Sequence, residues 1–393
     1  MITLLSKFFI KNRENTQDPG VRQAYGVLCG AVGIFLNLLL FGSKFLAGML
    51  SGSIAITADA FNNLSDAGSS IITLIGFKMA GQKPDPDHPF GHGRIEYISG
   101  LFVSVIILLM GFELIKSSAE KIFHPEELTY SPTVLVILLA SILMKCYMAA
   151  YNQSISKKIN SSAMKATATD SLSDCLATAV VLAATLISHF TGLSIDGWCG
   201  VLVGLFICYA GFEAAKDTIS PLLGQAPDPE FVKQVNDIVM SYDGVLGIHD
   251  MIVHNYGPGR ILISLHAEVP ADGDLLTLHD MIDVIEHKLR DTLHCSAVIH
   301  MDPVCVGDEE TEHLKELVTG CLKEISPSIS IHDFRIVKGP THTNVIFDIA
   351  VPYDFPMTDE ELIETAQRRI QRENPNYFAV IEVDKQYVPE KEG

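Results

Sequence analysis

Two pairs of polar residues inside long apolar runs are the part of this sequence best suited to chemistry. Asn62 and Asp66 lie in one such run, and Asp170 and Asp174 lie in another. Each pair is spaced i, i+4, so on a helix its two side chains lie one turn apart on the same face. Acids are costly in hydrocarbon, and membrane helices that keep them usually line an ion path. The pattern therefore predicts a metal-ion site within a membrane.

The donor atoms of these four residues indicate which metal would bind. They supply one amide oxygen and three carboxylates, without a histidine or a thiolate. Such hard oxygen ligands suit Mn²⁺, Mg²⁺ or Ca²⁺, whereas Zn²⁺ sites generally include nitrogen or sulfur. Neighbouring carboxylates repel one another, so at least one would take up a proton when the metal leaves. The alternative is that the acids cap helices or pair with Lys44 or Lys145.

The composition indicates a membrane protein with an acidic soluble tail. The 393 residues are 48% hydrophobic and only 19% charged, which is too apolar for one soluble domain. Residues 1–220 hold 15 Lys and Arg against 16 Asp and Glu, whereas residues 221–393 hold 13 against 31. A net charge of −19 argues against binding to nucleic acid.

Six segments reach the length of about 20 residues that a spanning helix needs. We place them near 26–49, 54–80, 96–118, 131–151, 164–189 and 196–217. Lys and Arg gather before the first segment, after the second and after the fourth, and are nearly absent from the opposite loops. By the positive-inside rule, both termini and the tail are cytoplasmic. We therefore expect a multi-pass protein of the plasma (cell inner) membrane, embedded in the lipid bilayer.

The tail after Pro221 has the alternating texture of a small α+β domain. Helix and strand patterns follow one another in the order αββαβ, which suits an open sheet with helices on one face. The pattern then repeats: His249 pairs with His332 at an offset of 83, and Asp302 with Asp384 at an offset of 82. We predict a duplicated module. The predicted domains are 1–25 (cytoplasmic segment), 26–220 (six-helix membrane domain), 221–307 (first α+β domain) and 308–393 (second, repeat-like module).

The loop after the second predicted span offers a further set of ligands. The stretch DPDHPFGHGR contains Asp85, His88 and His92, a set that could bind a divalent ion. Its prolines and glycines predict a turn rather than a helix. A solvated polar loop is the alternative interpretation.

The first tail module carries potential ligands on neighbouring strands and a helix, namely His249, His266, His279, His300 and Asp302. Two of them, His300 and Asp302, are two residues apart on a predicted strand and so share a face. Convergence on one sheet edge favours a metal site over scattered surface histidines. The second module has Asp348, Glu382 and Asp384 at matching positions, which makes it either an all-oxygen metal site or a decayed repeat.

These motifs together give the chain a family resemblance. Over about residues 15–305 it resembles the cation diffusion facilitator family of divalent-metal/proton antiporters, in its six spans, its D-P-D-H-P-F-G-H-G loop and its tail motifs I-H-D and I-H-M-D-P. The resemblance implies a ferredoxin-like, metallochaperone-like tail and a homodimer whose tails pack together. It also implies a loop metal site and a binuclear tail site at the residues named above. The second module lies outside the usual pattern of the family.

The resemblance also places the transport site in the second and fifth spans, at Asn62, Asp66, Asp170 and Asp174. Zinc-type members typically have His at the position of Asp170, so this chain looks like the manganese-exporting branch. We therefore expect a secondary transporter rather than an enzyme, exporting Mn²⁺ in exchange for protons, with the metal as substrate and structural ion. Export of Zn²⁺ or Fe²⁺ and a membrane-anchored metal sensor are the alternatives. No span carries the G-x-G-D motif of intramembrane aspartyl proteases.

Overall fold

The computed structural model describes residues 2–16, 18–51, 54–123, 132–191, 196–304, 308–339 and 341–386. The chain forms two compact units. One consists of Met1–Gln225 with Asn255–Arg260, and the other of Ala226–His254 with Ile261–Gly393.

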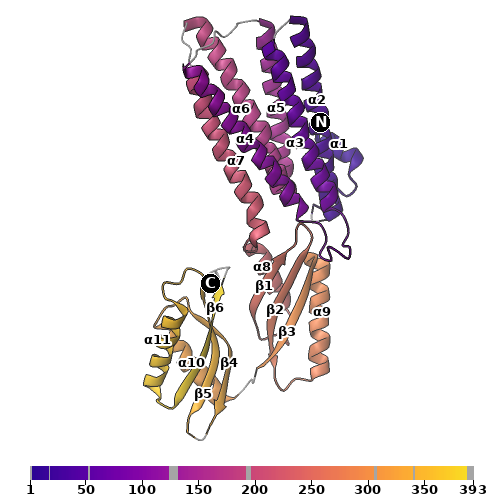
Figure 1. The fold of residues 1–393 in the computed structure, drawn as a ribbon. Coiled ribbons are helices and arrows are strands. Elements are labelled where there is room, and N and C mark those ends of the chain that lie inside the picture. The colour runs from indigo at the N-terminus through magenta and orange to yellow at the C-terminus, as the bar shows by residue number, and fades with distance from the viewer. Residues whose placement is uncertain are drawn as a thin grey trace. The chain divides into compact units, whose positions relative to one another are not determined.

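The first unit is helical (Figure 1). It begins with a short helix, α1 (Ile2–Phe9), and continues with α2 (Pro19–Ser51), α3 (Ile54–Ala80), α4 (Ile95–Phe123), α5 (Pro132–Ile159), α6 (Ser162–Thr191) and α7 (Asp196–Leu223). Among the described residues, α2, α4, α5 and α7 are long and apolar enough to cross a membrane. The long helices α3 and α6 hold the polar pairs, and a total of six spans stays a prediction.

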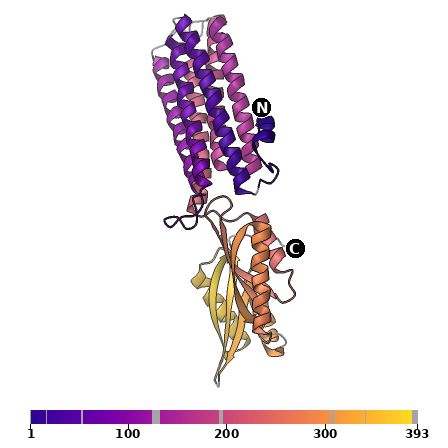
Figure 2. The ribbon, with the colours of Figure 1, turned by 90° about the vertical axis from the view of Figure 1, so that its right-hand side faces the viewer.

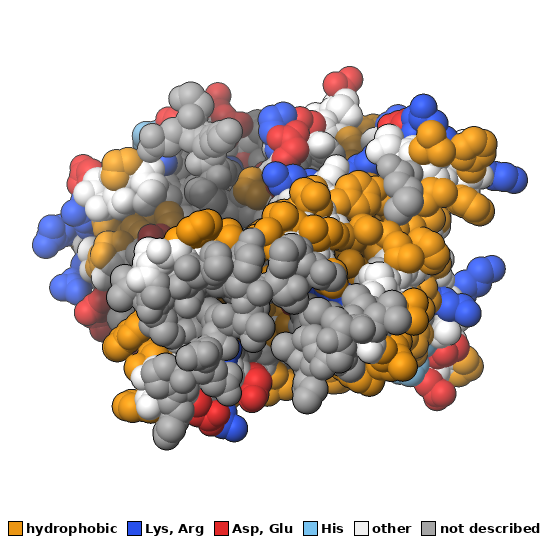
Figure 3. Space-filling view, turned by 90° about the horizontal axis from the view of Figure 1, so that it is seen from above, with side chains coloured by type: hydrophobic (Ala, Val, Ile, Leu, Met, Phe, Trp, Pro, Cys, Tyr) orange, Lys and Arg blue, Asp and Glu red, His pale blue; other side chains and the backbone are white. Residues whose placement is uncertain are grey.

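Small residues let the long helices approach closely. The pairs that pack most extensively are α4 with α7, α2 with α3, and α5 with α6. A Cβ atom added at Gly111 would lie 2.7 Å from Cys208 Sγ, and one at Gly204 would lie 3.1 Å from the Gly111 carbonyl oxygen. Close approach through glycine is typical of helices that associate in lipid. Apolar side chains cover much of the described surface in Figure 3, as expected for helices facing lipid.

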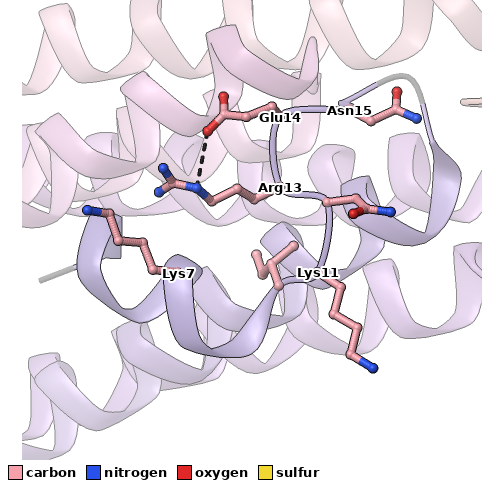
Figure 4. Close-up of a pocket in the computed structure, with 7 residues that line it drawn as sticks. Lys7, Lys11, Arg13, Glu14 and Asn15 are labelled. Atoms are coloured by element: carbon pink, nitrogen blue, oxygen red, sulfur yellow. Dashed lines mark ion pairs between the residues drawn. The ribbon is translucent and has the colours of Figure 1, made fainter.

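The helix α1 and the turn after it combine apolar and basic side chains. Phe8 and Phe9 are exposed, and Lys7, Lys11 and Arg13 border an open depression next to them (Figure 4). Arg13 Nε lies 3.1 Å from Glu14 Oε1. This composition is typical of a helix that lies in the membrane interface.

The second unit starts with a three-stranded α/β module. Its elements are α8 (Pro229–Val239), β1 (Gly247–Asn255), β2 (Ile261–Pro270), α9 (Leu275–Leu293) and β3 (Cys295–Val304), with sheet order β1-β2-β3. Strands β2 and β3 are parallel and place His266 opposite His300. The N-terminus of α9 is capped by Asp274, whose carboxylate accepts from the Thr277 backbone. Leu265 of β2 packs with α9 in a fully buried core.

A second module follows in the same unit (Figures 1 and 2). It consists of α10 (Glu309–Lys323), β4 (Ser330–Lys338), β5 (Thr343–Pro352), α11 (Asp359–Glu373) and β6 (Tyr377–Gln386), with sheet order β4-β5-β6. Strand β5 is antiparallel to β4 and parallel to β6. The core of the second module is separate from that of the first and contains Phe347, Leu362 and Ile370.

A buried ion pair ties three parts of the helical unit together. Arg22 of α2 donates to Glu96 Oε1 of α4 over 2.6 Å, and Ser161, between α5 and α6, donates to the same oxygen over 2.5 Å. The Glu96 side chain is only 3% exposed. Because both charges are out of water, each depends on the other.

We expect Glu96→Ala to destabilise the protein by about 3–5 kcal/mol, because it leaves the Arg22 charge without its carboxylate. The measurement is thermal or denaturant unfolding of the purified protein in detergent. Glu113→Ala, which removes an exposed carboxylate from the same helix, is the control. Equal stability of the two variants would show that the ion pair is not structural.

Candidate metal centres

A lysine lies at the centre of the polar pairs in the helical unit. Lys145 of α5 donates from Nζ to Asp66 Oδ2 of α3 and to Asp174 Oδ2 of α6, each over 2.6 Å. All three side chains are buried. The alternative interpretation of the sequence was that the acids pair with lysines, and Asp66 and Asp174 do pair with Lys145 in the structure. The same contacts bring these two acids from separate helices to one point.

Asp170 lies within electrostatic range of this network. It is buried, and the charges of Asp174, Asp66 and Lys145 all act on it. Among the described residues, Asp170 Oδ1 and Asp174 Oδ1 are buried atoms without a hydrogen-bond donor. Buried carboxylate oxygens normally have partners, and a pair of orphaned ones is what a cation site offers before it is filled.

The fourth predicted ligand, Asn62, lies differently. It is exposed in the single chain, while its neighbour Asn63 is buried at 2% exposure. Lys44, the other lysine named in the sequence alternative, is also buried, and its charge acts on Asp66. The structure thus brings together Asp66, Asp170 and Asp174, and does not show Asn62 with them.

The loop between α3 and α4 brings its three predicted ligands together. His88 Nδ1 lies 3.3 Å from Asp85 Oδ1, and His92 Nε2 lies 3.4 Å from Asp85 Oδ2. The backbone N–H of His88 donates to Asp85 over 2.7 Å, and this bond lowers the pKa of the Asp85 carboxyl. Gly91 has a φ of 82°, so the loop needs glycine there. The three ligand atoms lie close enough to hold one metal ion.

The first tail module clusters three of its five predicted ligands. His266 Nδ1 lies 2.9 Å from Asp302 Oδ2, and His249 Nε2 lies 3.2 Å from the same oxygen. Because β2 and β3 are neighbours, His266 and Asp302 reach a common point, and His249 joins from β1. The carboxylate of Asp302 is therefore flanked by two imidazole rings.

The other two predicted ligands lie at the margin of this cluster or outside it. His300 Nε2 is 3.3 Å from Asp302 Oδ1, but its side chain is 66% exposed. His279 of α9 is near Asp283, with 3.8 Å between His279 Nδ1 and the carboxylate, and the structure does not place it in the cluster.

Two cluster residues were absent from the ligands predicted from the sequence. Asp250 Oδ2 lies 3.2 Å from His249 Nδ1, and His332 of the second module stacks on His249 with 4.5 Å between ring centroids. His332 in turn groups with Asp348 and Asp384. Glu382, which was predicted, lies opposite Asp348 in the β5–β6 register but is exposed. The sequence signal for His332 was its repeat partner His249.

Burial and the neighbouring groups shift the pKa values of several residues in the tail cluster. Burial opposes protonation of His249, but its hydrogen bond with Asp250 and the nearby acids outweigh it and raise the pKa. That hydrogen bond also lowers the pKa of Asp250. Burial and then His249 lower the pKa of His332. Burial and then Asp384 raise the pKa of Asp348 to about 6.

Comparison with known proteins identifies the family. The model of the cation efflux transmembrane domain matches residues 31–223, and that of the cation efflux protein cytoplasmic domain matches residues 227–304. An uncharacterized transporter of Methanocaldococcus jannaschii is 32% identical over 269 residues, which is 68% of this chain and 95% of that protein.

Two further relatives have descriptive names. The manganese efflux system protein MneS of Bacillus subtilis is 27% identical over 274 residues, 70% of this chain and 94% of its own. The cation-efflux pump FieF of Escherichia coli is 26% identical over 294 residues, 74% of this chain and 98% of its own.

A helical membrane unit followed by an α/β tail with clustered His and Asp residues defines a membrane transporter of divalent metals. The chain belongs to the cation efflux family, also called the cation diffusion facilitators. It is therefore an integral membrane cation efflux transporter, of a family of transporters rather than enzymes. The matched cytoplasmic domain is a dimerisation domain, which indicates a homodimer.

The raised pKa of Asp348 predicts a pH-dependent stability. Folding favours the protonated form of Asp348 over its ionised form. The stabilisation that protonation of Asp348 gives is therefore full below pH 3.8 and is lost as the pH rises through about 6. We expect Asp348→Asn to stabilise the metal-free protein at pH 7, because the neutral amide avoids the cost of the ionised carboxylate. The gain should be only about 1 kcal/mol, because solvent screens this partly exposed side chain. The measurement is thermal unfolding with a chelator present.

The matched control is Asp354→Asn, which changes an exposed acid of the same module. The stabilisation by Asp348→Asn should shrink at pH 4. A gain that is the same at both pH values would contradict this origin of the effect.

Proposed function

We propose that this transporter exports Mn²⁺ from the cytoplasm in exchange for protons, by alternating access. The observation that carries the proposal is the network of Asp66, Asp170 and Asp174, three buried carboxylates on two long helices. No histidine or thiolate is among these predicted ligands. Oxygen donors favour Mn²⁺ over Zn²⁺. A relative named as a manganese efflux protein supports the same metal, while the name of FieF leaves the cation open.

The charges of the network match a divalent substrate. Three ionised carboxylates and one protonated Lys145 sum to −2, and the nearby charge of Lys44 offsets part of this, so a divalent cation is enough to neutralise the network. Without the metal, that charge is too costly to leave bare in a buried site, and protons on the carboxylates remove it. Metal and protons therefore compete for the same oxygens, which is the coupling that an antiporter needs.

Lys145 would act as a resident cation in this mechanism. It bridges Asp66 and Asp174 by two charge-assisted hydrogen bonds, so a metal ion that binds either of these Oδ2 atoms would displace Lys145 from it. Its return would help to expel the metal on the far side. Asn62, if it reaches the site in another conformation, would add a neutral oxygen and disfavour Zn²⁺.

The remaining sequence predictions belong to the same proposal. We infer a location in the plasma membrane with both termini cytoplasmic, from the distribution of Lys and Arg. Asp85, His88 and His92 would form a cytoplasmic cation site in the loop between α3 and α4. The alternative function, a membrane-anchored metal sensor, is favoured by the His and Asp clusters of the tail, and the transport experiment distinguishes it.

The test is uptake of Mn²⁺, Zn²⁺ and Fe²⁺ into vesicles that contain the purified protein, under an imposed pH gradient. We expect Mn²⁺ uptake with proton release, and a loss of roughly 100-fold or more in Asp174→Asn, because that change replaces a negatively charged ligand and proton acceptor with a neutral amide. Glu113→Gln, on an exposed face of α4, is the control.

Each other outcome has a distinct meaning. Normal uptake by Asp174→Asn would refute the site. Uptake of Zn²⁺ alone would keep the antiporter and refute the preference for oxygen donors. Metal binding without any uptake would favour the sensor.

Lys145→Met tests the resident-cation role. Removing the competing charge should tighten Mn²⁺ binding about tenfold, or roughly 1.4 kcal/mol, and slow uptake at saturating Mn²⁺ because release becomes harder. Binding to the detergent-solubilised protein and uptake by vesicles are the two measurements. Lys157→Met, which changes an exposed lysine of the same helix, is the control. Unchanged affinity and rate would show that Lys145 is only structural.

A further inference from the structure

We propose that the two tail modules share a second divalent-cation centre, formed by Asp250 of the first module with His332, Asp348 and Asp384 of the second. The family model of the cytoplasmic domain ends at residue 304, so three of these four ligands lie beyond it. The centre is distinct from the His249, His266 and Asp302 cluster, which lies wholly in the first module. It concerns the tail and does not depend on the metal or mechanism proposed for the membrane helices.

Asp250 is placed to serve both centres, one with each oxygen. Its Oδ2 lies 3.2 Å from His249 Nδ1 and 4.0 Å from His266 Nδ1, on the side of the first cluster. Its Oδ1 lies 4.0 Å from His332 Nε2, on the side of the second module. A carboxylate with one oxygen toward each set of ligands is suited to bridging two cations.

The second module supplies the other ligands from all three of its strands. His332 of β4 places Nε2 3.3 Å from Asp384 Oδ2 of β6. Asp348 of β5 pairs with His332 in the β4–β5 register. His332, Asp348 and Asp384 each offer an atom within 4.8 Å of the others, a spacing that one metal ion can span.

Two buried histidine nitrogens beside the proposed centre lack hydrogen-bond partners among the described residues. His249 is 6% exposed, and its Nε2 lacks a donor or acceptor in hydrogen-bonding geometry among the described residues, although Asp302 is near. His332 Nδ1 is likewise buried and without such a partner there. The two rings stack at an angle of 27° across the modules. The orphaned nitrogen of His249 faces Asp302 in the first cluster, whereas His332 turns its other nitrogen, Nε2, toward Asp384 in the second centre.

The electrostatics call for a cation at this point. Asp348 and Asp384 repel each other, and Asp250 acts on both from the other module. A divalent ion would turn that repulsion into a bond between the modules. The two centres should differ in metal preference. Apart from the shared Asp250, the first has two histidines and one acid, while the second has one histidine and two acids. The oxygen-rich second centre should select Mn²⁺.

The backbone shows that the second module reproduces the first at this position. Asp250 and its repeat counterpart Asp333 both have a φ of 51°, a left-handed conformation that Asp and Asn tolerate better than most residues. One ligand position differs clearly between the modules: where the first module has His266, the second has Asp348. The substitution converts a copy of the histidine-rich set into an oxygen-rich one.

The test measures the number of Mn²⁺ ions bound per chain and their affinities, for the full chain in detergent. Electron paramagnetic resonance reports the concentration of free Mn²⁺. Asp384→Asn and His332→Ala should each lower the affinity of one Mn²⁺ per chain by roughly 10–100-fold or more. Asp250→Asn, which keeps the left-handed backbone, should weaken the binding of two Mn²⁺ ions per chain. His342→Ala, on an exposed histidine of the same module, is the control and should change nothing.

A second readout follows the modules themselves. Spin labels are placed on exposed positions of α9 and α11. The distribution of distances between them should become narrower when Mn²⁺ is added to the unaltered protein, but not when it is added to Asp384→Asn. Mn²⁺ stoichiometry and affinity unchanged in both Asp384→Asn and His332→Ala would overturn the proposal. Because both readouts are independent of uptake, a failure here and a failure of the transport proposal can be told apart.

Discussion

Buried charge that must be balanced is the constraint on which the helical unit depends. Asp66, Asp170 and Asp174 are removed from water, and hydrocarbon offers them no compensation. Lys145 provides part of it by joining α3 to α6 through α5. In the proposed mechanism, Lys145 would yield its place to metal or to protons without leaving the site, because it is tethered to its own helix. The contacts that join these helices would then also be the ones that the proposed transport cycle breaks.

The tail satisfies the same constraint with different ligands. In the first module, histidines lie beside the carboxylates, and Asp302 lies between His249 and His266. In the second module the acids outnumber the histidines, and burial together with repulsion from Asp384 raises the pKa of Asp348. Each sheet is rigid because an apolar core backs it, so the ligand-bearing strands are held in position before any ion arrives. Preformed sites of this kind lower the entropy lost on binding.

Much of the site could be predicted because its residues are exceptional in their sequence context. An acid in an apolar run is visible without a structure, and so is an Asp–His–His turn rich in proline and glycine. Asn62 was predicted from its spacing and from the family resemblance, yet the helix exposes it and buries Asn63, because the rotation of a helix is set by its neighbours. His279 shares a module with the cluster but lies on α9 beside Asp283, which spacing could not reveal.

The sequence by itself determined the class of the protein, since apolar length, charge distribution and ligand type are local properties of the chain. It also contained the repeat that links His249 to His332. Only the tertiary structure decided which charges meet. That Lys145 joins two acids from different helices, and that Asp250 turns one oxygen toward each module, depends on contacts between residues 29 to 82 positions apart. Such contacts follow from how whole elements pack, and no periodicity in the sequence encodes them.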